Sequence, residues 1–514
     1  MTLAKVQSIS LQGLVGSLID IEVDIADGIP MYSLLGLPDA SLQESRDRVR
    51  AALVNSGQKW PNKKVTVSLS PAWMPKSGPG FDCAIALAIL IAEGALPQGP
   101  LTETVILGEL SLDGVIKPVR GVLPALISAR SSGIRRAIVP VANVAEAQLL
   151  PDMDVIAFRN LREIYLWLST GEFPVADEID LDFDEADESL DFADVAGQQR
   201  ARFAAEVAAS GGHHLLLIGP PGAGKTMIAN RIPSILPPLT EEEAIEVTAI
   251  HSVAGTLTKR SPMSRVAPIV APHHSASRAA IVGGGNRIIT PGAISTAHRG
   301  VLFIDEAPEC ATGILDSLRQ PLESGEITIT RQIGMATYPA RFLLVLAANP
   351  CPCGKFTGKG HGCTCTSLQV RRYLGKLSGP LMDRIDIRVE VDPVSRSDFA
   401  ATTLGESSKD IAQRVAASRN KAANRFKDEN WKLNSEIPAQ ALRSTYRPER
   451  EGMNFLHDEL DKERITARGL HKTIRLSWTL ADLAGRDFPT LEDVQTAFTL
   501  PHDEKSNTFH SSFT

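Results

Sequence analysis

The sequence predicts an α/β protein in which a core built on a parallel sheet lies between an α+β domain and a helical domain. Short apolar runs at residues 215–218, 301–304 and 342–347 are each followed by polar or glycine-rich sequence, as expected for buried parallel strands. Upstream of these runs, strand-like and helix-like segments alternate, and after about residue 395 only helical spacing remains. A chain of 514 residues is long enough for several domains, each with its own core.

The boundaries between these parts follow from an acidic segment. Nine acidic residues and no basic one lie between Asp177 and Asp191, a composition typical of a solvated linker because like charges repel one another. We therefore predict an α+β domain at 1–172, an acidic linker at 173–192, the sheet-containing core at 193–394, a helical lid at 395–503 and a tail at 504–514.

Hydrophobic periodicity gives the elements within these domains. In the N-terminal domain, strands are expected at 65–69 and 105–110 and helices at 42–56 and 81–93. In the C-terminal part, the apolar residues recur with helical spacing, which predicts helices at 411–426, 467–484 and 491–500.

The apolar runs of the sequence are too short for a membrane span, and its net charge does not decide about nucleic acid. The longest uninterrupted apolar run, 83–92, is about half the roughly 20 residues that a helix needs to cross a bilayer, and the first 14 residues do not resemble a secretory signal. We therefore expect a cytoplasmic protein. The net charge of −7 does not argue against nucleic-acid binding, because outside the acidic segment 53 basic residues face 51 acidic ones.

Residues 219–226 form a glycine-rich loop between a predicted strand and a predicted helix, and they fit the pattern G-x-x-x-x-G-K-[ST]. In that pattern backbone N–H groups surround phosphate oxygens at the start of a helix, the lysine reaches the β- and γ-phosphates and the threonine binds Mg²⁺. A glycine-rich turn that binds no ligand would not need to lie between a strand and a helix. The loop therefore predicts a site for ATP and Mg²⁺, formed by Gly219, Pro220, Pro221, Gly222, Ala223, Gly224, Lys225 and Thr226.

Polar residues at the ends of the next two strands complete the predicted site. Asp305 and Glu306 directly follow the strand at 301–304, where Asp305 would hold Mg²⁺ and Glu306 would polarise the attacking water. Two adjacent acids are also common as a helix cap. Asn349 follows the third strand and can orient that water, although an asparagine before a proline is equally a turn former.

These three strands, in this order, resemble the AAA+ ATPases, with Walker A at 219–226, Walker B at 301–306 and sensor 1 at Asn349. The segments APHHS, VGGG, PGAIS, NPCPCG and LMDRID resemble the magnesium-chelatase-like branch, and with the N-terminal domain the chain is similar to the bacterial ComM (YifB) proteins. The resemblance implies a homo-hexameric ring that hydrolyses ATP. For ComM-type proteins it also implies DNA helicase activity that drives branch migration during recombination in natural transformation, together with recombination proteins as partners.

The resemblance also assigns roles to single residues. Arg384 matches the arginine finger that enters the neighbouring subunit's site, although it could instead pair with Asp383 or Asp386 at a helix end. Two arginines are candidates for sensor 2, and Arg468 matches better than Arg475. Relatives carry a pore hairpin at the position of residues 326–334, where Arg331 could grip a DNA phosphate, and residues 283–287 could form a second pore element. Both segments could also be surface turns.

Four of the six cysteines lie within fifteen residues, in a glycine-rich loop at 351–365. Four thiolates can hold a tetrahedral zinc ion, and because they leave no open coordination position such a zinc would be structural. The alternatives are unliganded thiols and a redox pair. The two histidine pairs of the core show no metal spacing. We expect structural zinc on Cys351, Cys353, Cys363 and Cys365.

The N-terminal domain resembles the Lon-type proteases in residues 75–82, 108–114 and 133–140. Gly80 occupies the family's serine position, and the segment that carries the family's lysine contains no lysine here. Ser77 is close by but has no matching base. We therefore expect no peptidase activity, because a hydroxyl nucleophile needs a base to activate it.

The function predicted from the sequence is an ATP-driven AAA+ motor that acts on single-stranded or branched DNA. Three alternatives remain open at this point. The chain could be the ATPase subunit of a magnesium chelatase, a protein-remodelling chaperone, or a peptidase that uses Ser77. The first two share the nucleotide site with the DNA motor, so only the partner distinguishes them.

Overall fold

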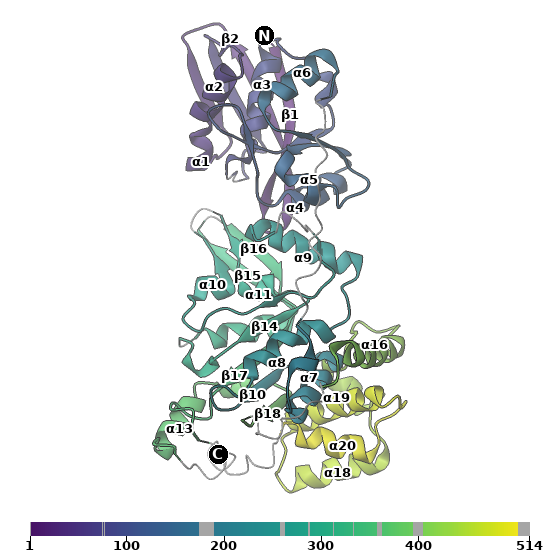
Figure 1. Ribbon diagram of the computed structural model, residues 1–514. Helices are drawn as coiled ribbons and strands as arrows, with labels where there is room; N and C mark the ends of the chain where they lie inside the picture. Colours follow the sequence, from purple (N-terminus) through teal and green to yellow (C-terminus); the bar gives the residue numbers. More distant parts are fainter. Residues whose placement is uncertain are drawn as a thin grey trace.

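The computed structural model describes residues 2–74, 76, 78–173, 190–257, 263–285, 288–311, 313–332, 334–356, 362–393 and 405–501. Figure 1 shows an elongated molecule in which the N-terminal domain, the sheet-containing core and the C-terminal helices follow one another. Most of the predicted acidic linker and the whole predicted tail lie outside the described residues. In the described residues, no helix is both long and apolar enough to cross a membrane.

A mixed sheet of seven strands forms the N-terminal domain, in the order β3-β4-β2-β1-β5-β8-β9. β1 and β2 make a long antiparallel hairpin, β4 pairs with β2 in antiparallel orientation, and the remaining pairs are parallel. The strands are β1 Thr2–Gln12, β2 Val15–Ala26, β3 Met31–Leu35, β4 Lys64–Ser70, β5 Thr104–Ile106, β8 Arg136–Pro140 and β9 Asp154–Phe158, and β6 Glu109–Leu110 with β7 Ile116–Lys117 form a separate short hairpin.

Helices cover both faces of this sheet. α2, α3 and α6 pack on one face, where every residue of α3 is buried, and α4 and α5 pack on the other. The predicted strand at 65–69 and helix at 81–93 are confirmed. The predicted helix at 42–56 is instead two helices, α1 and α2, and the predicted strand at 105–110 is divided into β5 and β6. The helices are α1 Ala40–Gln43, α2 Ser45–Asn55, α3 Asp82–Ala92, α4 Val122–Ser131, α5 Val144–Ala147 and α6 Leu161–Thr170.

The core contains a five-stranded parallel sheet in the order β11-β14-β17-β10-β18. The three apolar runs become β10, β14 and β17, which confirms their prediction as buried parallel strands. β17 lies between β10 and β14, so the polar residues that follow these three strands meet at one edge of the sheet. The strands are β10 Leu215–Ile218, β11 Ile269–Val270, β14 Val301–Ile304, β17 Leu343–Ala348 and β18 Ile387–Glu390.

Helices and two short hairpins surround this sheet. At the start of α9, Thr240 and Glu243 form a capping box, which satisfies two of the N–H groups that the first turn leaves free. The helices are α7 Gln199–Gly211, α8 Lys225–Arg231, α9 Glu241–Ala254, α10 Arg278–Val282, α11 Ala293–Thr296, α12 Arg319–Ser324, α13 Ser367–Leu374 and α14 Gly379–Met382. The hairpin strands are β12 Gly283–Gly284, β13 Thr290–Pro291, β15 Glu326–Arg331 and β16 Gly334–Pro339.

Beyond residue 405 the described chain is helical, as the periodicity predicts. α16 and α19 pack against α7 and the sheet, while α17, α18 and α20 complete a separate apolar cluster around Trp478. The three helices expected in this part correspond to α16, α19 and α20. Their bounds are α16 Ser408–Arg425, α17 Ala439–Arg443, α18 Arg450–Asp461, α19 Ala467–Leu483 and α20 Leu491–Thr499.

The N-terminal domain rests on the core through α4 and the tip of the β1–β2 hairpin (Figure 1). α4 packs on α9, and Ser252 of α9 accepts a hydrogen bond from the Gly121 N–H at 3.0 Å and donates one to Glu146 at 2.6 Å. A Cβ at Gly13, in the turn between β1 and β2, would lie 3.2 Å from the Ala336 side chain in β16. The β15–β16 hairpin, a candidate pore element from the resemblance to relatives, therefore contacts the N-terminal domain directly.

Candidate nucleotide-binding site

The glycine-rich loop joins the end of β10 to the start of α8, which is the strand, loop and helix order that phosphate binding requires. Gly222 and Gly224 have φ angles of +78° and +94°, a region that favours glycine. The Lys225 side chain folds back over the loop and donates hydrogen bonds to the carbonyl oxygens of Gly219 at 2.6 Å and Pro220 at 3.0 Å. Burial lowers the pKa of Lys225, and the carboxylates of Asp305 and Glu306 oppose that shift.

The two acids that follow β14 lie close to the first residues of α8. The hydroxyl of Thr226 donates to Asp305 Oδ2 at 2.7 Å, so the two predicted Mg²⁺ ligands are adjacent. Glu306 has a φ of +50°, an uncommon backbone conformation for a residue with a side chain, and its N–H donates to Asp305 Oδ1 at 2.8 Å. Threonine and carboxylate oxygens are suitable ligands for Mg²⁺. The donor set therefore fits the ion predicted from the sequence.

Asn349 lies at the end of β17, between the phosphate loop and the two acids. Its Oδ1 accepts a hydrogen bond from Lys225 Nζ at 3.1 Å. Asn349 therefore contacts the lysine that is predicted to reach the β- and γ-phosphates. The structure thus brings together Lys225, Thr226, Asp305, Glu306 and Asn349 from three strands.

Two residues of this site were not identified from the sequence. His274 follows the edge strand β11, and its Nδ1 lies 3.1 Å from Glu306 Oε2, so it is positioned to orient that carboxylate. Gln198 precedes α7 and its side-chain amide donates to the carbonyl oxygens of Ala223 and Asp392 at 3.1 and 2.6 Å. It therefore ties the phosphate loop to the chain after β18. His274 could have been suspected from the sequence, because it belongs to a histidine pair that directly follows an apolar segment.

Arg384, the predicted finger, lies just after α14 and is bound within its own chain. It pairs with Glu323 of α12 rather than with Asp383 or Asp386, and it donates to the Pro380 carbonyl oxygen at 2.6 Å. Burial lowers the pKa of Arg384, and the neighbouring guanidinium groups of Arg468 and Arg319 contribute to the same direction.

The two sensor 2 candidates have different surroundings. Arg468 is exposed at the start of α19 and pairs with Asp383, next to Arg384. Arg475 lies seven residues, or about two turns, further along α19 and donates to the Ile437 carbonyl oxygen at 2.9 and 2.7 Å. Its guanidinium is thus engaged within the helical domain, and Arg468 stays the better candidate.

The two predicted pore elements lie side by side. β15 and β16 form a regular antiparallel hairpin that carries the exposed Arg331 near its turn. A Cβ at Gly284, in the second element, would lie 2.8 Å from the Arg331 guanidinium. Among the described residues, Arg331 has no carboxylate partner. Asn286 and Arg287 of the second element lie outside the described residues.

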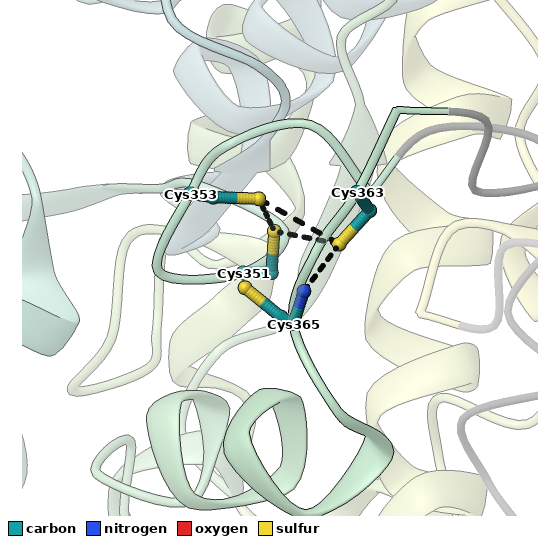
Figure 2. Close-up of side chains that lie close together, drawn as sticks. All are labelled: Cys351, Cys353, Cys363 and Cys365. Atoms are coloured by element: carbon teal, nitrogen blue, oxygen red, sulfur yellow. Dashed lines mark hydrogen bonds between the residues drawn. The ribbon is translucent and has the colours of Figure 1, made fainter.

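The four clustered cysteines converge in space, as Figure 2 shows. Cys351 Sγ lies 3.3 Å from Cys353 Sγ and 3.7 Å from Cys363 Sγ, and all four sulfur atoms lie within 4.8 Å of one another. The N–H of Cys365 donates to Cys363 Sγ at 3.4 Å. Sulfur atoms at the corners of a tetrahedron with Zn–S bonds of about 2.3 Å are about 3.8 Å apart. The described geometry therefore fits a zinc ion.

The part of the N-terminal domain that resembles a protease contains buried charges but no nucleophile at the family's position. Gly80 stands there, and its carbonyl oxygen accepts a hydrogen bond from Gly108 at 3.0 Å. Lys76 is fully buried and donates to the Pro71 carbonyl oxygen, and burial lowers its pKa. Asp82 pairs with Arg48 at 2.7 Å, and burial raises the pKa of Asp82 to about 6. Ser77 lies outside the described residues.

A parallel sheet with a phosphate loop after one strand and adjacent acids after another defines a P-loop ATPase of the AAA+ type. Models of the magnesium chelatase subunit ChlI family match residues 191–399, 21–143 and, for the C-terminal part, 405–500. The chain belongs to the magnesium-chelatase-like family that includes the ComM and YifB proteins.

Relatives support this assignment over nearly the whole chain. An uncharacterized protein of Mycobacterium tuberculosis is 48% identical, with 97% of this chain and 98% of the relative covered. The competence protein ComM of Haemophilus influenzae is 40% identical over 94% of each chain. The uncharacterized protein YifB of Escherichia coli is 39% identical over 97% of this chain and 96% of the relative.

A partial match adds the protease-like fold. Lon protease 2 of Bacillus subtilis is 28% identical over 167 residues, which cover 29% of this chain and 30% of the relative. This partial match is in keeping with the resemblance to Lon-type proteases found in the sequence.

Proposed function

We propose that the protein is an ATP-driven motor that moves on single-stranded or branched DNA in the cytoplasm and promotes branch migration during natural transformation. The constellation of Lys225, Thr226, Asp305, Glu306 and Asn349 carries the ATPase part of this proposal. Thr226 and Asp305 would hold Mg²⁺, which neutralises charge on the phosphates, while Glu306, oriented by His274, polarises the water. The relationship to a competence protein supports the part that concerns transformation.

The motor is proposed to work as a homo-hexamer, with ATP bound between subunits. The nucleotide site of one chain contains no arginine among the contacts described for Lys225 and Glu306, and Arg384 lies in a separate cluster with Glu323 and Asp383. A neighbouring subunit can supply the guanidinium that phosphoryl transfer needs. Arg468 is proposed to act as sensor 2 from the same cluster.

The β15–β16 hairpin is the proposed contact with DNA. Arg331 is exposed near its turn and is free of carboxylate partners among the described residues, so its charge is available for a phosphate. Phosphate contacts of this kind do not depend on sequence and weaken with salt. Recombination proteins that deliver the DNA are proposed as partners.

Measuring ATP hydrolysis with and without forked DNA tests the proposal. We expect forked DNA to raise the turnover of the wild-type protein, and to do so less at high salt. Glu306→Gln is the control, because it keeps the shape of the side chain but removes the base, and its turnover should fall by about 10²-fold or more.

The outcome also separates this proposal from its alternative. The matching family models are named for a magnesium chelatase subunit, so an ATPase that drives metal insertion is the second candidate function. That candidate predicts that chelatase subunits, rather than forked DNA, raise turnover, and a remodelling chaperone predicts stimulation by unfolded protein. Absence of both DNA binding and stimulation would contradict the DNA assignment and leave the ATPase intact.

We also propose that Cys351, Cys353, Cys363 and Cys365 hold a structural zinc ion. The convergence of four thiols, one of them fully buried, supports this site, because a tetrahedral zinc takes four such ligands. Elemental analysis of protein purified without chelators should find about one zinc per chain. A value near zero would contradict the zinc site.

A further inference from the structure

The loop that carries the four cysteines lies directly against the phosphate-binding loop. We propose that the metal held by these cysteines fixes the shape of the phosphate-binding loop, so that nucleotide affinity depends on occupancy of the metal site. This inference rests on the zinc and nucleotide sites proposed above. Two contacts between the loops support it, together with the small apolar core beneath the cysteines.

The first contact joins Gly354 to Pro221. Gly354 follows Cys353, has a φ of +73°, and donates its N–H to the Cys351 carbonyl oxygen at 2.9 Å. A Cβ at Gly354 would lie 2.5 Å from Pro221 Cδ and 2.8 Å from Pro221 Cγ, closer than side chains approach one another. The turn at residues 351–354, which contains the first two cysteines, is therefore in close contact with the second proline of the phosphate loop.

The second contact runs through Asn349. It lies two positions before Cys351, and its Oδ1 accepts the hydrogen bond from Lys225. The backbone of Asn349 faces the hydroxyl of Tyr373 and opposes the rise in the pKa of Tyr373 that burial causes. Tyr373 belongs to α13, the helix that packs beneath the cysteines. A shift of the cysteine loop would therefore act on Asn349, which contacts Lys225, and on Pro221, which belongs to the phosphate loop.

The apolar core that supports the described part of the cysteine loop is small. The buried members of its core are Cys351, Val370, Tyr373 and Leu374, and three of the partly buried members are the other cysteines. Neutral thiols are small apolar groups that contribute modestly to packing. Metal coordination, by contrast, links both arms of the loop through one centre, so its loss releases the contact with Pro221.

The charge of the metal site and its effect on the shape of the loop predict opposite changes in nucleotide affinity when the metal is lost. Zinc with four thiolates has a net charge of −2, which by itself weakens the binding of a negatively charged nucleotide nearby. If the metal acts instead by holding the loop in a binding-competent shape, its loss weakens nucleotide binding, because the apparent affinity falls with the fraction of competent molecules. The direction of the change therefore distinguishes the two effects.

The test measures the dissociation constant of a fluorescent, slowly hydrolysed ATP analogue with the full-length chain and Mg²⁺, alongside zinc content. We expect zinc loss in the double variant Cys353→Ser, Cys365→Ser and a dissociation constant about tenfold higher, as when the competent fraction falls to about a tenth. Cys310→Ser, a change at a cysteine outside the cluster, is the control and should bind both zinc and nucleotide normally.

A second variant separates the contact from the metal. Gly354→Ala keeps all four thiols but places a methyl group against Pro221, and we expect it to retain zinc while nucleotide binding weakens. Gly362→Ala is its matched control, because Gly362 has a similar φ of +90° but nothing within 4 Å of a built Cβ. Thermal unfolding shows whether each variant is folded.

The inference would be overturned if Gly354→Ala bound the nucleotide with wild-type affinity. It would also be overturned if the zinc-free double variant bound the nucleotide as tightly as the wild type or more tightly. If the double variant does not fold, the dissociation constant of the wild-type chain before and after removal of its zinc replaces it, because Gly354→Ala tests the contact and not the metal. The measurement contains no DNA, so a failure of the DNA assignment leaves its result unaffected. A dependence of nucleotide binding on zinc would hold whichever of the candidate ATPase functions is correct.

Discussion

Replacing Lys225 with alanine is expected to reduce ATP turnover by about 100-fold or more, because the only ammonium that the described site offers to the β- and γ-phosphates is lost. The change also removes the donor shared by the carbonyl oxygens of Gly219 and Pro220 and by Asn349. Steady-state hydrolysis and binding of an ATP analogue should both decrease. The chain should stay folded, since the site lies on a loop above an intact sheet.

Lys63→Ala is a suitable control for this measurement. Lys63 lies on the surface of the N-terminal domain, where its Nζ is 3.1 Å from the exposed Asp27, so its removal should cost little stability and no turnover. Wild-type hydrolysis by Lys225→Ala would show that the glycine-rich loop does not bind the phosphates. The ATPase assignment, and with it the proposed motor, would then be wrong.

The parts of the site that lie on contiguous residues could be predicted from the sequence. The phosphate loop and the pair Asp305 and Glu306 each follow an apolar run, and parallel strands bring such ends to one edge of a sheet. The same rule placed Asn349 between them, and the hydrogen bond from Lys225 now shows the contact. The four cysteines were also found because their spacing is local.

Contacts between distant segments could not be predicted in this way. His274 reaches Glu306 only because β11 pairs with β14 at the edge of the sheet, and Gln198 reaches Ala223 only because α7 packs beside the phosphate loop. Neither pairing leaves a periodic signal in the sequence. The contact between Gly13 and the β15–β16 hairpin has the same origin, since it depends on how two domains are packed.

Element boundaries differed where local geometry interrupts a periodic pattern. The expected helix at 42–56 is interrupted at Glu44, which ends α1 and precedes α2. The expected strand at 105–110 is interrupted at Gly108, where a Cβ would lie 2.7 Å from the Ile116 side chain. The close approach at Gly108 is a packing contact within the N-terminal domain, which hydrophobic periodicity does not report.

Changing Arg384 to alanine is expected to leave nucleotide binding intact and to lower the turnover rate by about 10³-fold or more, the effect of losing an arginine finger. The physical reason is that Arg384 contacts Glu323 and Pro380 in its own chain, and neither belongs to the nucleotide site. In a ring, the neighbouring subunit's ATP gains the guanidinium. Binding of an ATP analogue and steady-state hydrolysis measure the two effects separately.

Glu323→Ala distinguishes this role from a structural one. It breaks the same ion pair but keeps the guanidinium, and because Glu323 is largely exposed the pair contributes at most about 1 kcal/mol to stability. Turnover should therefore stay near the wild-type value. If Glu323→Ala loses as much activity as Arg384→Ala, the ion pair, and not the free charge, is what the protein needs.

Mixing two inactive variants tests the action between subunits. A chain with Arg384→Ala keeps its own phosphate loop, and a chain with Lys225→Ala keeps its own Arg384. In a mixed ring, the Lys225→Ala chain can supply the guanidinium to an intact site on its neighbour, so the mixture should hydrolyse ATP although each variant alone does not. Mixed rings that form but remain inactive would show that Arg384 does not complete a neighbouring site.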